Sequence, residues 1–314
     1  MKIIHLNEIK KCLESIDIIS VIEKGFEAYS KGEVVLPPIG ELIFENPPGD
    51  VHIKYGYIRN DDYYVIKVAS GFYDNPKLNL PSSNGLMLIF SQKTGGVCGI
   101  LLDEGHLTDL RTAAAGAIAA KYLAPRVVNR IGIIGTGTQA KLQLRYLKNI
   151  FSCKDVIVYG KNDHHLSQFN IEMEHNGFQI KTTKNIEEVT SSCNLLITTT
   201  PSTSPLLFAD QIKKGSHITA VGTDSPQKQE LDAEIFKNAD IIVADSKKQC
   251  IERGDIAHAI NKKLIAEEQL IELGNIISGK NKGRTNEQQI TIADLTGLAV
   301  QDIQIAKSVF KAIK

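Results

Sequence analysis

The sequence predicts an α/β protein in which an α+β part is combined with a doubly wound parallel sheet. The chain has 314 residues, enough for two domains at about 150 residues each. The first third contains strand-like segments that are separated by clusters of Gly and Pro. From residue 130 onward, short apolar segments alternate with helical patterns, which is typical of a parallel sheet with crossover helices.

The first part is predicted to contain strands that lie between two helices. Apolar residues at helical spacing predict a helix over residues 16–30. Thr108 precedes an alanine-rich run and is a suitable N-cap, so we expect a second helix to begin there and to end before Pro125. Segments rich in Val, Ile, Tyr and Phe are predicted strands, and they cover residues 52–57, 64–70 and 85–91.

The second part is predicted to form the parallel sheet. A final helix is expected over residues 297–314, and we expect it to return to the first part of the chain. The expected strands of the sheet are short and apolar, and they cover residues 130–134, 155–159, 195–198, 217–221 and 240–243.

Composition and charge exclude several classes of function. The chain has 36 Lys and Arg against 36 Asp and Glu, so it lacks the basic excess of a general nucleic-acid or anionic-membrane binder. Its five cysteines have no CxxC spacing, which argues against a disulfide framework or a structural zinc site. The N-terminus lacks a signal-peptide pattern, and the small-apolar stretch over 112–120 is too short to span a bilayer. We therefore expect a soluble cytoplasmic protein that holds no metal.

A glycine-rich turn follows the first strand of the predicted parallel sheet. Residues 131–140 contain the pattern GxGxxA, between an apolar strand and a helix expected over 141–149. Gly135 permits the tight turn, Gly137 lets the backbone approach a pyrophosphate, and Ala140 allows the helix to pack closely on the strand. Free N–H groups at the helix N-terminus would bind that pyrophosphate. This context predicts a Rossmann dinucleotide-binding unit; the alternative is a glycine-rich turn that binds nothing.

The end of the next strand bears on the choice of dinucleotide. NAD-binding units place Asp or Glu there to bind the ribose hydroxyls. Here the strand is followed by Gly160 and Lys161. Glycine leaves room and lysine supplies a positive charge, which suits a 2′-phosphate. We predict NADP(H) as the preferred cofactor, with NAD(H) as the alternative if Lys161 is only an exposed lysine.

Polar residues follow two further strands at the edge where ligands of such sheets bind. Thr199 and Thr200 follow one strand, and Val221 and Gly222 lead to Asp224 after the next. A carboxylate at that place is a candidate proton donor or acceptor. The alternative is an Asx-turn aspartate before a proline-containing loop.

Two cations stand in positions that are awkward for solvated charges. Arg111 is expected in the first turn of the alanine-rich helix, where a cation opposes the helix macrodipole unless it binds an anion. Lys67 lies between apolar pairs in a predicted strand. It is either on an exposed face or buried against an anion. The alternative for Arg111 is an exposed, solvated side chain.

Together these motifs resemble the ornithine cyclodeaminase/μ-crystallin family. The resemblance extends from about residue 30 to the C-terminus. The blocks LTDLRTAAA and AVGTDSPQKQEL are its specific part, whereas GxGxxA is not specific. The other matching stretches are VIKV at 65–68, the remainder of DEGHLTDLRTAAA at 103–115, TTT at 198–200, HITAVGTDSPQKQEL at 217–231 and TGLAVQD at 296–302.

The resemblance implies a domain organisation and a set of site residues. Residues 1–113 and 298–314 would form an α+β substrate-binding and dimerisation domain, into which a Rossmann NAD(P)-binding domain of residues 114–297 is inserted. Lys67 and Arg111 would hold the α-carboxylate of an amino or imino acid, and Asp224 would be the acid/base group. The expected cofactor-binding residues are Arg111, Thr112, Gly135, Gly137, Thr138, Gln139, Ala140, Gly160, Lys161, Thr199, Thr200, Val221, Gly222 and Gly297.

The chain departs from the cyclodeaminase pattern at two positions. Ile39 stands where family members often have arginine. Lys54 stands where the cyclodeaminase has a glutamate for the terminal ammonium of its substrate, and a lysine would repel that ammonium. His52, Lys54, Lys67 and Arg111 instead suggest a pocket for an anionic substrate. The stretch around these residues resembles a branch with ectoine-utilisation proteins and iminosuccinate reductase.

These observations lead to one principal hypothesis and two alternatives. The principal hypothesis is an NAD(P)H-dependent reductase of a small carboxylated imine, or the reverse amino-acid dehydrogenase, which acts as a homodimer. The first alternative is a cyclodeaminase that recycles bound NAD and releases ammonia. The second is a non-catalytic NADPH-dependent ligand binder of the μ-crystallin type, against which the retention of Asp224 argues.

Overall fold

A computed structural model describes residues 1–72 and 74–313 of the chain. The chain divides into two compact units. Unit 1 comprises Met1–Arg111 and Leu298–Lys314, and unit 2 comprises Thr112–Gly297. Unit 2 begins two residues before the predicted boundary and ends at the predicted one. Among the described residues, no helix is long and apolar enough to cross a membrane.

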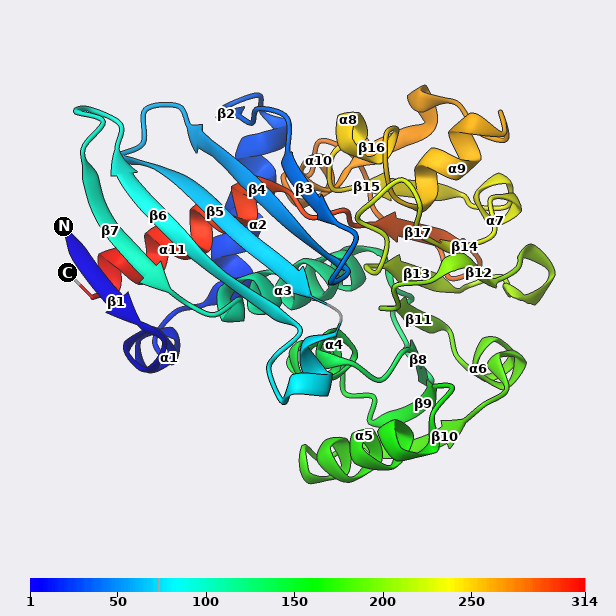
Figure 1. The fold of residues 1–314 in the computed structure, drawn as a ribbon. Coiled ribbons are helices and arrows are strands. Elements are labelled where there is room, and N and C mark those ends of the chain that lie inside the picture. The colour runs from blue at the N-terminus through cyan, green and yellow to red at the C-terminus, as the bar shows by residue number, and fades with distance from the viewer. Residues whose placement is uncertain (73, 314) are drawn as a thin grey trace. The chain divides into compact units, whose positions relative to one another are not determined.

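Over the described residues, unit 1 is built on a seven-stranded sheet with the order β1-β7-β6-β5-β4-β2, in which β3 also pairs with β4 (Figure 1). Neighbouring strands in this sheet are antiparallel, except that β1 and β7 are parallel. The three strands predicted from the sequence are the long central ones, and the four missed strands lie outside them. The strands are β1 (Lys2–His5), β2 (Val34–Val35), β3 (Gly40–Phe44), β4 (Gly49–Ile58), β5 (Tyr63–Phe72), β6 (Ser83–Ser91) and β7 (Val97–Leu102).

Two helices, α2 (Ile18–Ser30) and α11 (Ala299–Ala312), lie behind the strands of this sheet in Figure 1. The helix α1 (Leu6–Leu13) follows β1 and contacts β1, β7 and α11. A short 3-10 turn covers Asn75–Leu78. The helix predicted over 16–30 begins at Ile18, because the Asp17 carboxylate caps it by accepting the Ser20 N–H at 3.2 Å. The helix α11 packs on β4 and β5, which places residues such as Ile303, Val309 and Phe310 in the core of the first unit.

The two faces of the sheet differ in burial. The face under α11 carries alternate residues such as Val65, Met87 and Leu101, which are fully buried. The opposite face is only half-buried although it is apolar. Tyr64 and Phe90 stack on it at 4.8 Å between ring centroids. Its other apolar members include Ile53, Tyr55, Tyr57, Ile66, Val68, Leu86, Leu88 and Ile100.

Unit 2, whose residues 112–297 are all described, contains the predicted parallel sheet. Its order is β10-β9-β8-β11-β13-β17-β15-β16, so the chain runs to one side after β8 and then returns to the other side. A separate pair joins β12 (Thr203–Leu207) and β14 (Gln229–Leu231). The strands of the main sheet are β8 (Ile131–Ile134), β9 (Asp155–Tyr159), β10 (Gln179–Thr183), β11 (Leu195–Thr198), β13 (His217–Ala220), β15 (Ile241–Ala244), β16 (Leu270–Glu272) and β17 (Thr291–Asp294).

The helices of unit 2 fall between the strands. The boundary between the units lies within α3 (His106–Leu123). Two further short 3-10 turns cover Ala209–Gln211 and Glu267–Gln269. The remaining helices are α4 (Thr138–Leu147), α5 (Asp163–His175), α6 (Ile186–Ser192), α7 (Glu234–Lys237), α8 (Lys247–Cys250), α9 (Asp255–Asn261) and α10 (Leu273–Ile277).

The sequence missed a central strand of this sheet. All five predicted strands are present, but β17 lies between β13 and β15. Its residues Thr291 and Asp294 are polar and fully buried, so a four-residue segment with polar ends has no strand-like apolar pattern. Long-range pairing with two neighbouring strands, rather than local propensity, makes it a strand.

Polar side chains join the amino-terminal ends of these strands. Arg284 donates hydrogen bonds to the carbonyls of Leu123 at 2.7 Å and Ser216 at 2.9 Å. His217 is fully buried, and its Nδ1 lies 2.8 Å from Thr291 Oγ1. Burial, and secondly the nearby Arg284 guanidinium, lower the pKa of His217 to about 3. The imidazole is therefore neutral in the folded protein at all ordinary pH values.

This neutral histidine predicts a loss of stability in acid. Between pH 6.5 and 3 the unfolded chain binds a proton at His217 that the folded chain does not, so its contribution is present above pH 6.5 and is lost as the pH falls. The slope is about 1.4 kcal/mol per pH unit. We expect the wild type to lose about 2 to 3 kcal/mol more than His217→Gln between pH 6.5 and 4.5, measured by urea unfolding. Equal losses in the two proteins would contradict this assignment.

Candidate active site

A cleft of about 580 Å³ opens at the carboxyl ends of the strands in unit 2. It lies where the strand order reverses, between β8 and its neighbours, which is where ligands of such sheets bind. Its volume is within the usual range for small-molecule pockets. Three loops line it, and they comprise residues 135–137 after β8, 160–162 after β9 and 199–202 after β11. The other lining residues are Tyr159, His165 and, in β12, Thr203, Ser204 and Leu206.

The glycine-rich turn has the conformation that its sequence predicts. Gly135 has φ +120°, and a Cβ there would lie 2.6 Å from Thr199 Oγ1. A Cβ on Gly137 would meet no atom within 4 Å, so packing inside the described protein does not explain this glycine. Gly137 is the N-cap of α4 and leaves the helix without a side-chain cap. Ala140 is fully buried. Open backbone at an uncapped helix start fits a pyrophosphate.

The other predicted cofactor residues lie around this turn. Thr138 and Gln139 form the first turn of α4. Lys161 is exposed and lines the cleft. Gly160 also lines it, but a Cβ there would lie 2.8 Å from Thr136 Cγ2, so close packing of the turn already requires glycine. Room for a ligand is therefore not the only reason for this residue.

The loop after β13 contains the predicted acid/base residue. The strand ends at Ala220, so Val221 and Gly222 begin the loop. A Cβ on Gly222 would lie 2.2 Å from the carbonyl oxygen of Thr200, so only glycine allows these loops to approach. The Asp224 side chain is 45% exposed, and its Oδ1 lies 2.7 Å from the ammonium of Lys228. Its exposure leaves it accessible for proton exchange.

Two of the predicted cofactor-binding residues, Thr112 and Gly297, are the first and last residues of unit 2. The carbonyl of Thr112 accepts a hydrogen bond from Gln143 at 3.2 Å. Gly297 has φ +84° and donates its N–H to Asp245 at 2.7 Å. Both backbones are held inside unit 2.

A buried cluster of charges occupies the helix-covered face of unit 1. Lys67 is 2% exposed, and its ammonium lies 3.0 Å from Asp302 Oδ2. The Arg111 guanidinium, 4% exposed, donates to Asp302 Oδ1 at 2.9 Å and to Gln301 Oε1 at 2.7 Å. Asp302 is on α11 and is 1% exposed. The anion that both cations contact in the folded chain is therefore a side chain of the protein itself.

Lys54 belongs to the same cluster. It is directly opposite Lys67 in the antiparallel register of β4 and β5, and it is 8% exposed. Lys54 is therefore not a solvent-exposed strand lysine. Burial alone would raise the pKa of Asp302, but Arg111, Lys67 and Lys54 together hold it below its ordinary value. Burial also lowers the pKa of the Lys67 ammonium, against the attraction of Asp302.

The position of Arg111 differs from the prediction. The helix α3 begins at His106 rather than at Thr108, because the Asp103 carboxylate accepts the Leu107 N–H at 2.9 Å and caps the start. Arg111 is therefore in the second turn, and the macrodipole argument for an anion at this residue was wrong. The alternative of a solvated arginine is also wrong, since Arg111 is buried.

Two further residues complete the surroundings of the cluster. Burial raises the pKa of Asp103 to about 6, against the attraction of Lys67. His52 lies on the same strand as Lys54, with its ring nitrogens 3.5 Å from Glu41 and 3.5 Å from Asp50. These carboxylates compensate a charge on His52, so it adds less positive potential than the sequence suggested.

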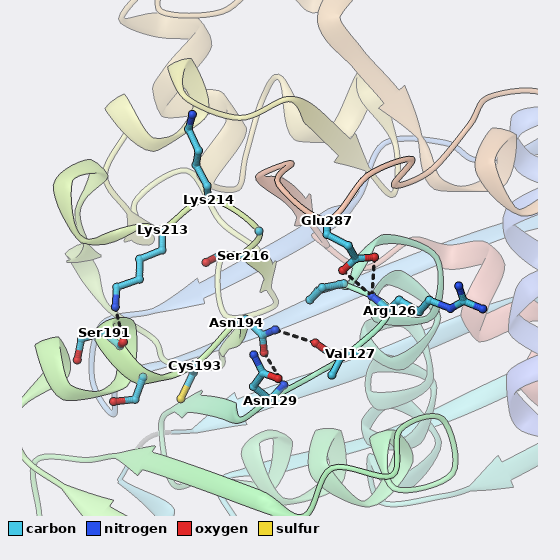
Figure 2. A pocket seen from close by; sticks show the side chains of 13 residues that line it. Arg126, Val127, Asn129, Ser191, Cys193, Asn194, Lys213, Lys214, Ser216 and Glu287 are labelled. Atoms are coloured by element: carbon cyan, nitrogen blue, oxygen red, sulfur yellow. Dashed lines mark hydrogen bonds between the residues drawn. The ribbon is translucent and has the colours of Figure 1, made fainter.

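A second cavity in unit 2 lies at the opposite edge of the sheet. Its volume is about 640 Å³, and Figure 2 shows that hydrogen bonds between its own lining groups hold it together. Asn194 donates to Val127 O at 2.9 Å, and Lys213 donates to Ser191 O at 2.6 Å. Across the described residues, no group of three or more His, Cys, Asp or Glu is placed to hold a metal ion. Ligands of such sheets bind at the carboxyl ends of the strands, so the cleft at that edge is the candidate cofactor site.

The fold is a Rossmann-type unit joined to an α+β unit, which confirms the predicted class. The chain belongs to the ornithine cyclodeaminase/mu-crystallin family, whose profile matches residues 2–314. The resemblance inferred from the sequence blocks is therefore confirmed.

Curated relatives align with most of the chain. An uncharacterized cyclodeaminase of Sinorhizobium fredii is 39% identical, over 99% of this chain and 95% of the relative. The alanine dehydrogenase of Archaeoglobus fulgidus is 36% identical, over 98% and 94%. The iminosuccinate reductase of Paracoccus denitrificans is 34% identical, over 78% and 76%. The names of the last two agree with the predicted enzyme class, an NAD(P)-dependent oxidoreductase that acts on CH–NH or C=N bonds.

Two solved structures share the whole fold. An archaeal alanine dehydrogenase dimer with bound NAD has a TM-score of 0.89 and 35% identity, over 99% of this chain and 95% of its own. The Δ1-pyrroline-2-carboxylate reductase of Thermococcus litoralis, in complex with NADH and L-proline, has a TM-score of 0.92 and 29% identity, over 99% and 97%. The fold is therefore one that accommodates a nicotinamide dinucleotide in these relatives.

Removal of the central carboxylate should destabilise unit 1. Asp302→Asn leaves Lys67 and Arg111 buried without their anion, which we expect to cost about 3 to 5 kcal/mol of unfolding free energy. Urea unfolding at neutral pH measures this loss. Asp62→Asn is the matched control, because Asp62 contacts Lys311 at the surface. A loss no greater than that of the control would show that Asp302 does not compensate the two cations.

Proposed function

We propose that the protein is an NAD(P)H-dependent reductase of a small carboxylated imine, or the dehydrogenase of the corresponding amino acid. The observation that carries this proposal is the buried charge cluster of unit 1. Among the described residues, Lys54, Lys67 and Arg111 meet there around Asp302. The three cations outnumber the two carboxylates, Asp302 and Asp103, even when both carboxylates are ionised. A substrate carboxylate would neutralise the remaining positive charge.

The geometry of the cluster supports a substrate-binding role for its cations. Asp302 uses one oxygen on each cation, which leaves further N–H donors of Lys67 and Arg111 for a second carboxylate. Because Asp302 and Gln301 on α11 already hold these two side chains, substrate binding would not have to order them, which favours a defined orientation of the reacting carbon. Lys54 would assist, or would bind a second carboxylate of the substrate.

The cleft of unit 2 would hold the dinucleotide. Gly135, Gly137 and the first turn of α4 would bind the pyrophosphate, and Thr199 and Thr200 would flank it. Val221, Gly222 and Gly297 would complete the binding surface, with Arg111 and Thr112. A bound reduced nicotinamide would supply the hydride that converts C=N to CH–NH. Asp224, or a water beside it, would exchange the proton at nitrogen, since its side chain is partly exposed.

Named relatives support an imine substrate but leave its side chain open. The solved reductase with bound L-proline acts on a cyclic imino acid by its name, and the Paracoccus relative acts on iminosuccinate by its name. The second candidate is a cyclodeaminase, which the name of the Sinorhizobium relative favours. The buried Lys54 argues against ornithine as the substrate, because the terminal ammonium of ornithine would face the lysine without a counter-charge.

A homodimer and a cytoplasmic location are part of the proposal. The open face of the unit 1 sheet is apolar and only half-buried, and burial of that face against a second copy would remove it from water. A relative in this fold is described as a dimer. The five cysteines form no disulfide, which supports a reducing compartment.

Consumption of cofactor tests the proposed reaction. We expect stoichiometric oxidation of NADPH or NADH with pyrroline-2-carboxylate, or with 2-oxo acids plus ammonia or methylamine. Lys67→Ala and Arg111→Ala should lower kcat/KM roughly 30- to 1000-fold by removing a charge-assisted bond to the carboxylate. Lys93→Ala, at an exposed lysine, should have no effect. Ammonia release from ornithine without net NAD(P)H consumption would support the cyclodeaminase instead.

Lys161 tests the choice of cofactor. If Lys161 binds a 2′-phosphate, the wild type should bind NADPH more tightly than NADH, and Lys161→Asp should reverse this preference. Titration calorimetry with both dinucleotides measures the four dissociation constants. A wild type that binds NADH tenfold more tightly would overturn the assignment of Lys161.

Lys54 tests the specificity for anionic substrates. Lys54→Glu should lower activity on an acidic imine such as iminosuccinate much more than on pyrroline-2-carboxylate, because a carboxylate would then repel the second acidic group. Lys93→Glu makes the same charge change at the surface and is the control. Steady-state kcat/KM values for both substrates provide the comparison. Equal losses on the two imines would argue against a pocket role for Lys54.

A further inference from the structure

Glu230 is a fully buried carboxylate to which the sequence assigned no role. It lies in β14, and both of its oxygens accept hydrogen bonds. Oε1 accepts from Thr200 N at 2.5 Å and from Thr200 Oγ1 at 2.8 Å. Oε2 accepts from Gly222 N at 2.9 Å and from Thr198 Oγ1 at 2.8 Å. One side chain thus joins the carboxyl ends of the adjacent strands β11 and β13.

The two ends are packed as closely as their backbones allow. A Cβ on Gly222 would lie 2.2 Å from Thr200 O and 2.6 Å from Glu230 Oε2. The carboxylate therefore fills the space between the two loops and binds an N–H from each. Because main-chain N–H groups only donate, an acceptor is required on both sides of this space.

A second carboxylate fixes the position of Glu230 itself. Asp255 Oδ1 accepts the N–H groups of Glu230 and Leu231, both at 2.8 Å, and its Oδ2 accepts the hydroxyl of Thr223 at 2.7 Å. Burial, and secondly Asp255, raise the pKa of Glu230 to about 7, while the hydrogen bonds from Thr200 and Thr198 act in the opposite direction. Four donors around a buried acid indicate a site built to hold a carboxylate.

The place of these loops relative to the cleft suggests their use. The strand order reverses at β8, with β9 on one side and β11 and β13 on the other. A dinucleotide that lies across such a reversal places its adenosine half over the strand that follows the glycine-rich turn, here β9 with Lys161, and its nicotinamide half on the other side. Thr200 and Gly222 belong to that other side.

We infer that Glu230 is a positioning residue for the nicotinamide half of the dinucleotide, and that it acts by holding the loops after β11 and β13 at a fixed separation. The inference rests on the proposed cofactor site. It assigns to Glu230 no contact with the cofactor. The adenosine half, bound at the β9 side, should be insensitive to Glu230.

Glutamine is the informative substitution at this position. In Glu230→Gln the amide has one acceptor oxygen and one NH₂ group. In either orientation the NH₂ group faces a main-chain N–H, of Thr200 or of Gly222, so one loop must move away. The size of the side chain is unchanged, which limits the disturbance of the surrounding core.

Binding of complete and truncated ligands distinguishes positioning from general damage. We expect Glu230→Gln to weaken binding of NADPH and NADH by about 10- to 100-fold, from the loss of a buried hydrogen bond in the loops. Binding of 5′-AMP and of adenosine 2′,5′-bisphosphate, which contain only the adenosine half, should change less than about threefold, as expected for a site on the β9 side. Titration calorimetry on the full chain measures all four affinities. Thermal unfolding verifies that the variant is folded.

Two other variants keep the test decisive. Asp240→Asn removes a carboxylate that accepts the Ile290 N–H at 2.7 Å at the opposite edge of the same sheet, and it should leave all four affinities unchanged. If Glu230→Gln does not fold, Thr198→Val removes one donor to Oε2 and should show a smaller loss for the complete dinucleotides only.

The outcomes separate this inference from the proposed function. If the wild type binds neither dinucleotide, the proposed cofactor site is wrong, and the inference fails with it. If the wild type binds a dinucleotide and Glu230→Gln weakens complete and truncated ligands equally, the cofactor site stands and the positioning role is overturned. Unchanged affinities in a folded Glu230→Gln variant would also overturn it. A selective loss for the complete dinucleotides supports it.

Discussion

The burial of Asp302 is the interaction on which unit 1 depends. Lys67 and Arg111 could not be removed from water beneath α11 without an anion, because isolated buried charges are strongly unfavourable. Asp302 provides that anion from a helix 191 residues further along the chain than Arg111. The helix α11 thus packs on the sheet and also supplies the carboxylate that compensates the buried cations. Packing of the core and the geometry of the proposed substrate site therefore depend on the same helix.

Carboxylates have a related structural use in unit 2, where they bind backbone rather than cations. Glu230 and Asp255 each accept two main-chain N–H groups near the carboxyl edge of the sheet, and Asp245 accepts the N–H groups of Ser246 and Gly297. Loops that leave parallel strands carry orphan donors, and buried acids satisfy them. The loops proposed to hold the cofactor are therefore shaped by residues that need not contact it.

Local patterns predicted much of the fold. The glycine-rich turn, the five strands of the parallel sheet and the long central strands of unit 1 all follow from apolar segments and turn residues in the sequence. Gly135 has the positive φ that the tight turn predicts, because backbone conformation depends mainly on adjacent residues. The same local reasoning misplaced the start of α3 by two residues, since the cap is Asp103 and precedes the alanine-rich run.

The sequence by itself determined the family and the Rossmann-type architecture. It also identified the cations at 54, 67 and 111 as unusual residues. Only the tertiary structure decided what those cations contact and which carboxylates hold the loops. Asp302 and Glu230 are ordinary acidic residues in a linear pattern. Their partners are Lys67 and Arg111 in one case and Thr198, Thr200 and Gly222 in the other. Periodicity indicates which face of an element is buried. The partners of buried charges and of main-chain N–H groups, in contrast, come from segments that meet only after folding.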